Sequence, residues 1–557
     1  MYPYIKTILF ALALALGYAP LLQRIQSFEG VAGLLAYLVL VGLVIFGVIL
    51  GALSRLFLVR LAWAILLSGG VLFELSYFHV MADHLTYDAF LELYASRNFL
   101  GDAMQQYAQP LLASLPCAAA LFAAILMSPA RSMRPGESRI ASFLSVIGPA
   151  GVILALSVLL FARGGSGASA LPFGIPVYAF FSLAVYEEVV DPDVARLPVT
   201  IPRTGDTLAG DLVLIIDESL RGDYLDINHP RGVDSGLQEN YPGIEVLNLG
   251  LSVSATNCSI GSNMILRFGG RRDNYREHLK SMPSIWEYAA KAGLATVYID
   301  AQSEHRFFNG MTDEEIAHIG RIIQFHGVEP LYRDIEAGKA LKKLLADDVQ
   351  QLILVNKLGP HFPINDKYPP TYARFQPSLP TGSFVDTAVS GRMPELFSGQ
   401  WDLYKNSYKN TIEWTVGQFF RELLTDLELN QTLIFYTGDH GQSFHERGEP
   451  GLRSHCTPGA VPAMEEGVVP MVVIGGTALN PQLQAVLLKK HNASSHYALF
   501  PTLLEALGYD SEQVEAVYGP SLLSPLEDPM TFNSRFRARL GLLPVWNRVD
   551  INELVSP

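Results

Sequence analysis

The sequence predicts a bundle of five transmembrane helices followed by a large α/β domain, whose mostly parallel sheet is sandwiched by helices. Long apolar segments are confined to the first third of the chain, and further on short apolar runs alternate with helical patterns. The composition agrees, because 49% of the residues are hydrophobic, 17% are charged and the mean hydropathy is +0.23. We therefore predict a transmembrane domain over 1–165, a linker with an interfacial helix over 166–204, and a soluble domain over 205–557.

Five segments approach the length needed to cross about 30 Å of hydrocarbon. They are residues 8–22, 31–53, 58–81, 111–127 and 143–161. The first is short enough to be mistaken for a signal peptide. We reject that interpretation, because Lys6 is the one basic residue before it and further spans follow in place of a cleavage site and a soluble domain.

Basic residues in the short loops predict the orientation of the bundle. One set of loops carries Lys6, Arg55, Arg60, Arg131, Arg134 and Arg139, whereas the other carries Arg24, Arg97 and Arg163. The first set should be cytoplasmic. Because the chain would then cross the membrane five times, everything after about residue 165 should lie on the opposite side. In a Gram-negative cell that side is the periplasm.

The segment that joins the two domains begins with the flexible run 164–169, rich in glycine and serine. The apolar, aromatic stretch 171–186 follows, and we expect it to lie at the membrane surface as an interfacial helix. A sixth span is the alternative, but it would invert the topology and contradict the charge pattern.

Apolar runs in the soluble domain predict its strands, and the patterns between them predict helices. The predicted strands are 212–216, 295–300, 351–356, 433–436 and 468–474, with helices at 260–267 and 284–292. The run 212–216 is continuously apolar, which is typical of a strand covered on both faces. Such alternation favours a mostly parallel sheet with helices on both sides.

Two of these predicted strands end in acidic residues. Asp439 and His440 follow the run 433–436, and Asp217 and Glu218 close the run 212–216. In open α/β sheets ligands bind beyond the carboxyl ends of the strands. Carboxylate and imidazole are ligands for Zn²⁺, so the pattern indicates a metal site, although Asp-His-Gly alone is a weak signal.

A polar turn, Ser254 to Ser259, precedes the predicted helix 260–267. The hydroxyl of Thr256 can be a helix cap. It can also be a nucleophile, because a helix N-terminus favours an incoming phosphate and a metal ion lowers the pKa of a hydroxyl.

Together these segments resemble the alkaline-phosphatase/sulfatase superfamily, and specifically its membrane-bound phosphoethanolamine transferases. The resemblance covers most of the chain and rests on six motifs in the same order. They stand here as Glu218-Ser219-Leu220-Arg221, Thr256-Asn257-Cys258-Ser259, Gly359-Pro360-His361-Phe362-Pro363 with Lys367-Tyr368-Pro369, Tyr408-Lys409-Asn410-Thr411, Asp439-His440-Gly441-Gln442-Ser443, and His455.

The resemblance implies an alkaline-phosphatase-like (sulfatase) domain that holds Zn²⁺ through Glu218, Thr256, Asp439 and His440. Thr256 would attack phosphatidylethanolamine, leaving a covalent phosphoethanolamine intermediate that an envelope acceptor, such as lipopolysaccharide lipid A or a core sugar, then takes up. His361 and His455 would stabilise charge or move protons, and Arg221 would fix a carboxylate or the phosphate. A second divalent metal at His445 and Glu446 stays open, as does a purely structural role for each histidine, His496 included.

The resemblance also implies a monomeric, multi-pass enzyme of the bacterial inner membrane with a periplasmic catalytic domain. It suggests that the polar segment 83–109, expected to be a loop, lines the entry of the lipid donor; a solvated amphipathic loop is the alternative. The net charge of −14 argues against nucleic acid as a partner.

Three other functions stay in view. A phosphoglycerol transferase, acting on a periplasmic glycan, would share the spans, the threonine and the metal set but would use phosphatidylglycerol. A sulfatase-like phosphoester hydrolase is a second alternative, although residues 256–261 lack the Cys/Ser-x-Pro-x-Arg motif of sulfatases. An inactive membrane-anchored scaffold is disfavoured, because all four metal positions are intact.

Several residues depart from the family pattern and indicate a divergent branch. Gln442 stands in place of the usual glutamate and Gly261 in place of the usual proline. The chain has three cysteines, and Cys117 falls within a predicted span. A bridge between Cys258 and Cys456 is conceivable, but no disulfide framework is the default expectation.

Overall fold

The computed structural model describes residues 2–28, 30–81, 83–95, 100–130, 139–190, 195–303, 311–361, 364–380, 401–448, 454–457, 462–476, 478–536 and 543–555. Contacts divide them into two compact units: the first comprises the described residues up to 190 together with Leu543, and the second comprises the other described residues from 195 onward. Each unit is described by itself.

The first unit is entirely helical. Its helices are α1 (Tyr2–Leu16), α2 (Tyr18–Gln26), α3 (Val31–Ala52), α4 (Phe57–Met81), α5 (Tyr87–Ala95), α6 (Leu100–Leu126), α7 (Arg139–Ala162) and α8 (Ile175–Val190), with a short 3₁₀ turn η3 (Pro172–Gly174) before α8. Within the described residues, four helices are long and apolar enough to cross a membrane, or five if α1 and α2, bent by 55°, form one broken span. The five predicted segments correspond to these helices.

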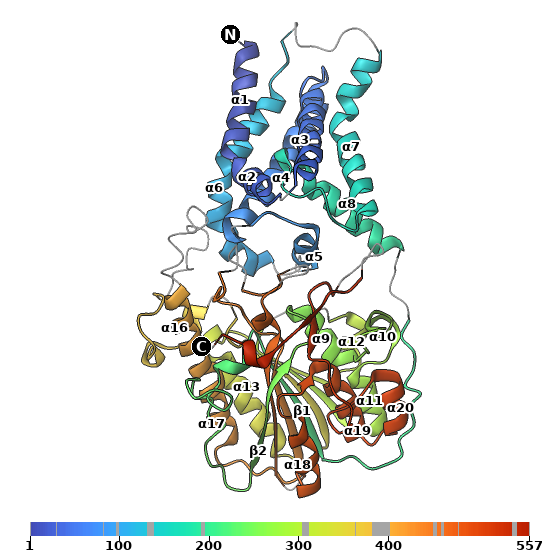
Figure 1. Cartoon of the computed structure of the whole chain (residues 1–557), viewed down its shortest axis with the longest axis vertical. Coiled ribbons are helices and arrows are strands. Elements are labelled where there is room, and N and C mark those ends of the chain that lie inside the picture. The colour runs from blue at the N-terminus through green and yellow to red at the C-terminus, as the bar shows by residue number, and fades with distance from the viewer. Residues whose placement is uncertain are drawn as a thin grey trace. The chain divides into compact units, whose positions relative to one another are not determined.

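Small residues allow a close approach between α3 and α7. A Cβ added at Gly47 would lie 2.3 Å from Val152, and one added at Gly148 would lie 2.8 Å from the carbonyl oxygen of Gly47. Glycines spaced like Gly47 and Gly51 allow two apolar helices to pack backbone to backbone. The packing of α3 on α7, and of α4 and α1 on α6, builds the bundle (Figure 1).

One segment of this unit differs from the expectation, and another agrees with it. The segment 83–109, expected to be a loop, forms α5 and the first turns of α6, because apolar residues recur at helical spacing and bury Tyr87, Phe90 and Leu91. The stretch 171–186 is helical as predicted, over α8, which packs against α7 and α4. Among the described helices, α8 is not one of the candidate spans.

The second unit is built around one eight-stranded sheet. Its strands are β1 (Asp211–Asp217), β2 (Glu245–Val253), β3 (Ala295–Asp300), β4 (Arg321–Gln324), β5 (Gln351–Asn356), β6 (Thr432–Gly438), β7 (Val468–Gly475) and β8 (Ser494–Ser495). They stand in the order β4-β3-β5-β1-β6-β7-β2-β8, and β7 alone among these eight runs antiparallel to its neighbours. The prediction of a mostly parallel sheet is confirmed.

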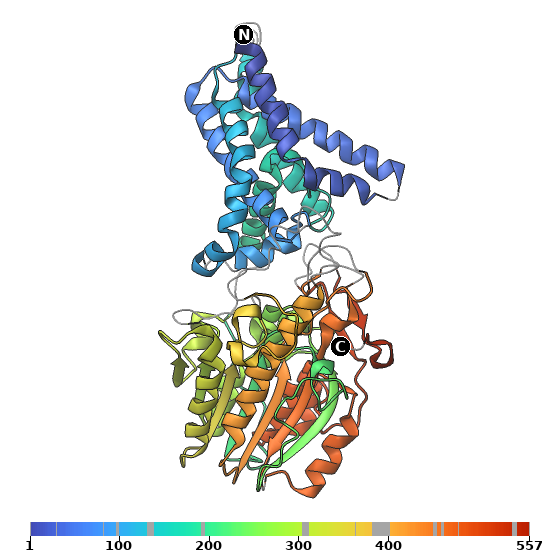
Figure 2. The same ribbon diagram turned by 90° about the vertical axis from the view of Figure 1, so that its left-hand side faces the viewer.

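Helices cover both faces of this sheet (Figures 1 and 2). One face carries α9 (Ser259–Phe268), α11 (Ile285–Ala292) and α19 (Leu499–Ala506), and the other carries α13 (Pro330–Leu345) and α17 (Phe419–Leu424). The remaining helices are α10 (Tyr275–Ser281), α12 (Asp313–Ile316), α16 (Trp401–Ile412), α18 (Pro481–Leu487) and α20 (Ser511–Tyr518), with a π-helical turn η7 (Glu413–Gln418) and a small sheet of β9 (Thr531–Asn533) and β10 (Trp546–Arg548).

The central position of β1 explains its continuous apolar run. Leu212, Leu214 and Ile216 point into the core shared with α11 and α19, and the residues between them face the opposite layer. Every residue of β1 and of β6 is buried. The two strands that carry the Glu218 and Asp439 motifs are therefore hydrogen-bonded neighbours in the middle of the sheet.

Candidate metal centre

The site forms where β1 and β6 end. The register pairs Asp217 with Gly438, so that the residues that follow, Glu218 and Asp439, leave the sheet side by side. The backbone N–H of Asp439 donates to the carbonyl oxygen of Asp217 at 2.8 Å. The backbone N–H of Ser219 donates to Asp439 Oδ1, also at 2.8 Å. The parallel pairing itself thus brings two carboxylates together at the sheet edge.

A tight turn after β1 aims Glu218. Ser219 adopts a left-handed backbone with φ of +58°, which is uncommon outside glycine. Its hydroxyl donates to Glu218 Oε1 at 3.1 Å, and its carbonyl oxygen accepts from the Tyr408 hydroxyl and from Gln442 Nε2. Gln442, the departure from the usual glutamate, therefore supports the turn that presents Glu218.

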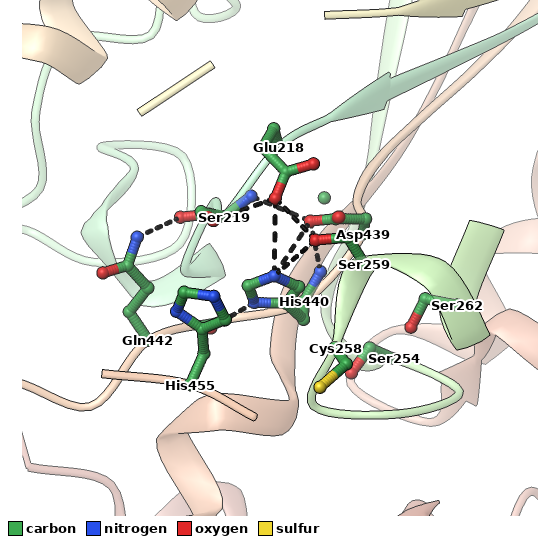
Figure 3. Close-up of polar contacts among 12 residues, drawn as sticks. Glu218, Ser219, Ser254, Cys258, Ser259, Ser262, Asp439, His440, Gln442 and His455 are labelled. Carbon is green, nitrogen blue, oxygen red and sulfur yellow. Dashed lines mark hydrogen bonds and ion pairs between the residues drawn. The ribbon is translucent and has the colours of Figure 1, made fainter. Parts of the chain in front are cut away.

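Glu218, Asp439 and His440 form a cluster with metal-binding geometry (Figure 3). One ligand atom from each lies within 4.8 Å of the others, and all three side chains are buried. His440 Nε2 is 3.5 Å from Glu218 Oε1 and 3.8 Å from Asp439 Oδ1. Ligands about 2.0–2.1 Å from a tetrahedral ion are about 3.3–3.4 Å apart, so these separations suit Zn²⁺. In the described part of the chain, this is the one cluster of three or more such side chains.

Two atoms of the cluster, one on His440 and one on Asp439, are placed to bind a cation. His440 Nδ1 lies 2.7 Å from the carbonyl oxygen of Gly441, which can only accept, so Nδ1 carries the proton and Nε2 is left as a ligand. Asp439 Oδ2 is buried without a hydrogen-bond partner. A buried carboxylate oxygen without a donor is costly unless an ion compensates it.

The electrostatics of the cluster lead to the same conclusion. Burial and the neighbouring charge of Glu218 raise the pKa of Asp439 well above its usual range. Burial opposes ionisation of Glu218 too, but the hydrogen bond to His440 and the charge of His361 lower the pKa of Glu218 below its usual range. Burial disfavours the imidazolium of His440, yet the two carboxylates raise its pKa to about 9. Two buried carboxylates in contact favour any cation that can lie between them.

The hydroxyl that reaches this cluster belongs to Ser259, the first residue of α9. Ser259 Oγ lies 2.7 Å from Glu218 Oε1 and 3.1 Å from His440 Nε2. Thr256, the predicted nucleophile and fourth ligand, is fully buried in the preceding turn. Its Oγ1 donates to the carbonyl oxygen of Cys258 at 2.7 Å. Sequence reasoning selected the threonine of Thr-x-x-Ser, and the one signal for Ser259 was its place at the start of the helix.

Both remaining predicted histidines lie near the cluster. The ring of His455 stacks on that of His440, with centroids 4.5 Å apart and planes 21° from parallel. His361 is exposed, after the turn that follows β5, and its charge acts on Glu218. Phe362 and Pro363 of the same motif lie outside the described residues. A disulfide joins Cys258 to Cys456, a bridge that the sequence left open.

Arg221 and the two residues considered for a second metal are engaged elsewhere. The guanidinium of Arg221 pairs with Asp223 at 2.8 Å and with Glu446 at 2.5 Å. Its NH2 group also donates to the carbonyl oxygen of Val555. The ring of His445 stacks on that of Trp401. Glu446 and His445 therefore face different partners, and Arg221 braces the segment after the Asp-His motif.

His496 has a structural position under the site. Its Nδ1 accepts from the backbone N–H of Ala255 at 3.2 Å, and its Nε2 lies 3.1 Å from Thr437 Oγ1. Burial lowers the pKa of His496 to about 3, so the ring is neutral at physiological pH. It links the end of β6 to the turn before α9.

Comparison with known proteins shows which proteins this chain is similar to and which family it belongs to. Two curated proteins named Kdo(2)-lipid A phosphoethanolamine 7''-transferase are similar to the chain. The protein of Escherichia coli (strain K12) is 27% identical over 320 residues, covering 54% of this chain and 52% of the relative. The protein of Salmonella typhimurium is 25% identical over 330 residues, covering 56% and 53%. The chain thus spans about half the length of the curated relatives it matches.

Among solved structures, the integral membrane protein lipooligosaccharide phosphoethanolamine transferase A from Neisseria meningitidis matches with a TM-score of 0.56. The match covers 93% of this chain and 98% of that one at 15% identity, which is a likeness of fold. The family model described as Sulfatase matches residues 211–509, from the start of β1 to beyond α19. Because this match covers more than half of the 557 residues and includes Glu218, Asp439 and His440, the chain belongs to the sulfatase family.

Proposed function

We propose that the chain is an inner-membrane phosphoethanolamine transferase. It would move phosphoethanolamine from phosphatidylethanolamine to a cell-envelope acceptor, the lipid A or core sugar of lipopolysaccharide. The observation that carries the proposal is the buried cluster of Glu218, Asp439 and His440 beside the N-terminus of a helix. A cation and a helix N-terminus together form a site for a phosphate group. The names of the two curated relatives support phosphoethanolamine as the transferred group and a lipid A derivative as the acceptor.

Glu218, Asp439 and His440 would hold Zn²⁺, with a hydroxyl from the turn 256–259 as the fourth ligand. Bound there, Zn²⁺ supplies Lewis acidity that lowers the pKa of that hydroxyl and offsets charge on the phosphate. Ser219 and Gln442 orient Glu218, and the carbonyl oxygen of Gly441 orients His440. These contacts fix the site before substrate enters, as efficient transfer requires.

His455 and His361 would handle protons and charge during transfer. His455 lies directly against His440, and His361 is exposed and therefore accessible to a substrate. Arg221 would act by bracing the segment after the Asp-His motif, since its guanidinium is bound to two carboxylates. The charge of Arg221 is therefore directed at these carboxylates and not at the phosphate.

The helical unit would anchor the enzyme, as a monomer, with its catalytic unit in the periplasm. The candidate spans, counted as five with the bent pair α1–α2, support this topology together with the distribution of basic residues. A disulfide near the site suits an oxidising compartment.

The test is transfer by the full-length protein in vesicles, with Zn²⁺ and lipopolysaccharide. Phosphatidylethanolamine vesicles should give lipopolysaccharide that gains phosphoethanolamine, measured by mass spectrometry, and Asp439→Asn should abolish the gain. A gain of phosphoglycerol from phosphatidylglycerol vesicles would assign the chain to that alternative activity. Release of free ethanolamine phosphate with unmodified lipopolysaccharide would identify a hydrolase and overturn the proposal.

A further inference from the structure

The hydroxyl of Ser259 completes the candidate metal cluster. Its Oγ lies 2.7 Å from Glu218 Oε1 and 3.1 Å from His440 Nε2, closer than the 3.5 Å that separates those two atoms from each other (Figure 3). Ser259 is also half-buried, whereas Glu218 and His440 are buried. A nucleophile must be accessible to phosphorus while remaining in contact with the groups that activate it, and Ser259 meets both conditions.

Thr256 meets neither condition, because the turn encloses it. Its Oγ1 donates to the carbonyl oxygen of Cys258 at 2.7 Å and accepts from the backbone N–H of Cys258 at 3.0 Å. Its backbone N–H donates to Ser262 Oγ, and its carbonyl oxygen accepts from Ser254 Oγ. With 0% of its surface exposed, Thr256 acts as a local cap that shapes the turn.

Gly261 explains how the turn can close around Thr256. A Cβ added at Gly261 would lie 2.7 Å from Thr256 Cγ2 and 2.7 Å from the ring of Phe536. The absence of a side chain at position 261 lets the methyl group of Thr256 pack inward. The glycine that replaces the usual proline is thus coupled to the burial of Thr256, and Ser259 is left at the cluster.

We infer that Ser259, and not Thr256, is the nucleophile of this enzyme and the fourth ligand of its metal ion. The inference rests on the proposed function. Ser259 is the first residue of α9, a helix of ten residues, so its oxygen lies at the positive end of the helix dipole. That position stabilises both an alkoxide and an incoming phosphate.

The transfer then balances in two halves. Ser259 Oγ forms a bond to the phosphorus of the donor phosphodiester, the bond from phosphorus to the diacylglycerol oxygen breaks, and that oxygen takes the electron pair and the proton lost by Ser259. In the second half, an acceptor hydroxyl oxygen bonds to phosphorus and the Oγ–P bond breaks. The proton of the acceptor returns to Ser259 Oγ, which regenerates the enzyme.

The test is to locate the covalent adduct. Full-length protein in phosphatidylethanolamine vesicles, with Zn²⁺ and without acceptor, is digested, and the peptide carrying the added phosphoethanolamine is sequenced by tandem mass spectrometry. We expect the adduct on Ser259 in the wild type, in Thr256→Val and in Ser511→Ala, which removes another serine that begins a helix. Ser259→Ala should lose it, and Ser259→Thr should regain it. An adduct on Thr256, or one that persists in Ser259→Ala, would overturn the inference.

A parallel arm separates this inference from the proposed function. A phosphoglycerol adduct on Ser259 from phosphatidylglycerol vesicles would refute the donor but support the nucleophile. If neither lipid gives an adduct, the Zn²⁺ affinity tests whether Ser259 is a ligand. It is measured by competition with a chelator, in variants whose thermal stability equals that of the wild type. Loss of about tenfold in affinity in Ser259→Ala, without loss in Thr256→Val, supports Ser259 as a ligand. Equal affinity in the two variants refutes it.

Discussion

Cys258 and Cys456, 198 residues apart in sequence, are joined by a disulfide at the edge of the metal cluster. The bond ties the turn before α9 to the segment that carries His455. Asn257 reinforces it, because its carbonyl oxygen accepts from the backbone N–H of Cys456 and its Nδ2 donates to Glu466. Two sides of the site, far apart in the chain, are therefore held in fixed relation.

Removing the disulfide should impair transfer more than metal binding. We expect Cys258→Ser with Cys456→Ser to lower the free energy of unfolding of the unit by about 2–5 kcal/mol. Transfer should fall about tenfold or more, because His455 is no longer held against His440. The candidate ligands Glu218 and His440 lie at the sheet edge, so bound Zn²⁺, measured by atomic absorption, should stay at the wild-type level. Cys117→Ser in the membrane unit is the control, and full transfer by the double variant would contradict the expectation.

Gly359 is expected to be essential for the position of Glu218. A Cβ at Gly359 would lie 2.4 Å from Asp217 Oδ1 and 2.6 Å from the carbonyl oxygen of Glu218. Gly359→Ala should therefore displace the turn after β1 and weaken Zn²⁺ binding about tenfold or more, measured by calorimetry. Gly327→Ala is the matched control, since Gly327 has a similar positive φ and open space around it. Equal Zn²⁺ affinity in the two variants would refute the argument.

Lys357 compensates a carboxylate beneath the site. Its ammonium group pairs with Asp217, donates to the carbonyl oxygen of Thr415 and is fully buried. Lys357→Met should destabilise the unit by about 3–5 kcal/mol, because it leaves the Asp217 charge buried without a counter-ion. Adding Asp217→Asn should restore most of that loss in a denaturant titration. Equal stability of the wild type and the single variant would show that Asp217 is protonated in the fold.

Zn²⁺ should stabilise the fold through the cluster and not through Glu446. At a hundredfold excess over its dissociation constant, Zn²⁺ should raise the free energy of unfolding by about 2.7 kcal/mol. Asp439→Asn should abolish the corresponding rise in melting temperature. Glu446→Gln, which breaks the pair with Arg221, should lower the melting temperature and keep the Zn²⁺-dependent rise. If Glu446→Gln lost the Zn²⁺-dependent rise in melting temperature, that result would support a metal ion bound by Glu446.

Asp211, at the start of β1, should make stability depend on pH. Burial raises the pKa of Asp211 to about 7, although the N–H of Gln351 partly opposes the shift. The folded state thus binds the proton more tightly than the unfolded chain, whose aspartate pKa is about 3.9. The stabilisation that protonated Asp211 gives the folded state is complete below about pH 4 and is lost as the pH rises through about 7. Asp211→Asn should raise the melting temperature at pH 8 by about 2 °C or more and leave it unchanged at pH 4. The same rise in melting temperature at both pH values would contradict a raised pKa for Asp211.

Local patterns in the sequence were sufficient for the main architecture and for three of the candidate metal ligands. Apolar runs long enough to cross hydrocarbon identified the candidate spans of the first unit, because a segment without polar side chains satisfies its backbone in lipid by forming a helix. The runs at 212–216 and 433–436 became β1 and β6, and acidic residues at their ends mark a sheet edge wherever parallel strands pair. Glu218, Asp439 and His440 could therefore be selected without coordinates.

Only the tertiary structure decided which hydroxyl meets that cluster, whether the cysteines pair, and what Arg221 binds. Thr256 and Ser259 are three residues apart in one turn, and the packing of Gly261 against Thr256 buries the first and leaves the second at the cluster. Cys258 and Cys456 meet because two distant loops converge at one edge of the sheet. Sequence patterns report local conformation and burial, whereas these outcomes depend on side-chain directions and on contacts between remote segments, which exist only once the chain has folded.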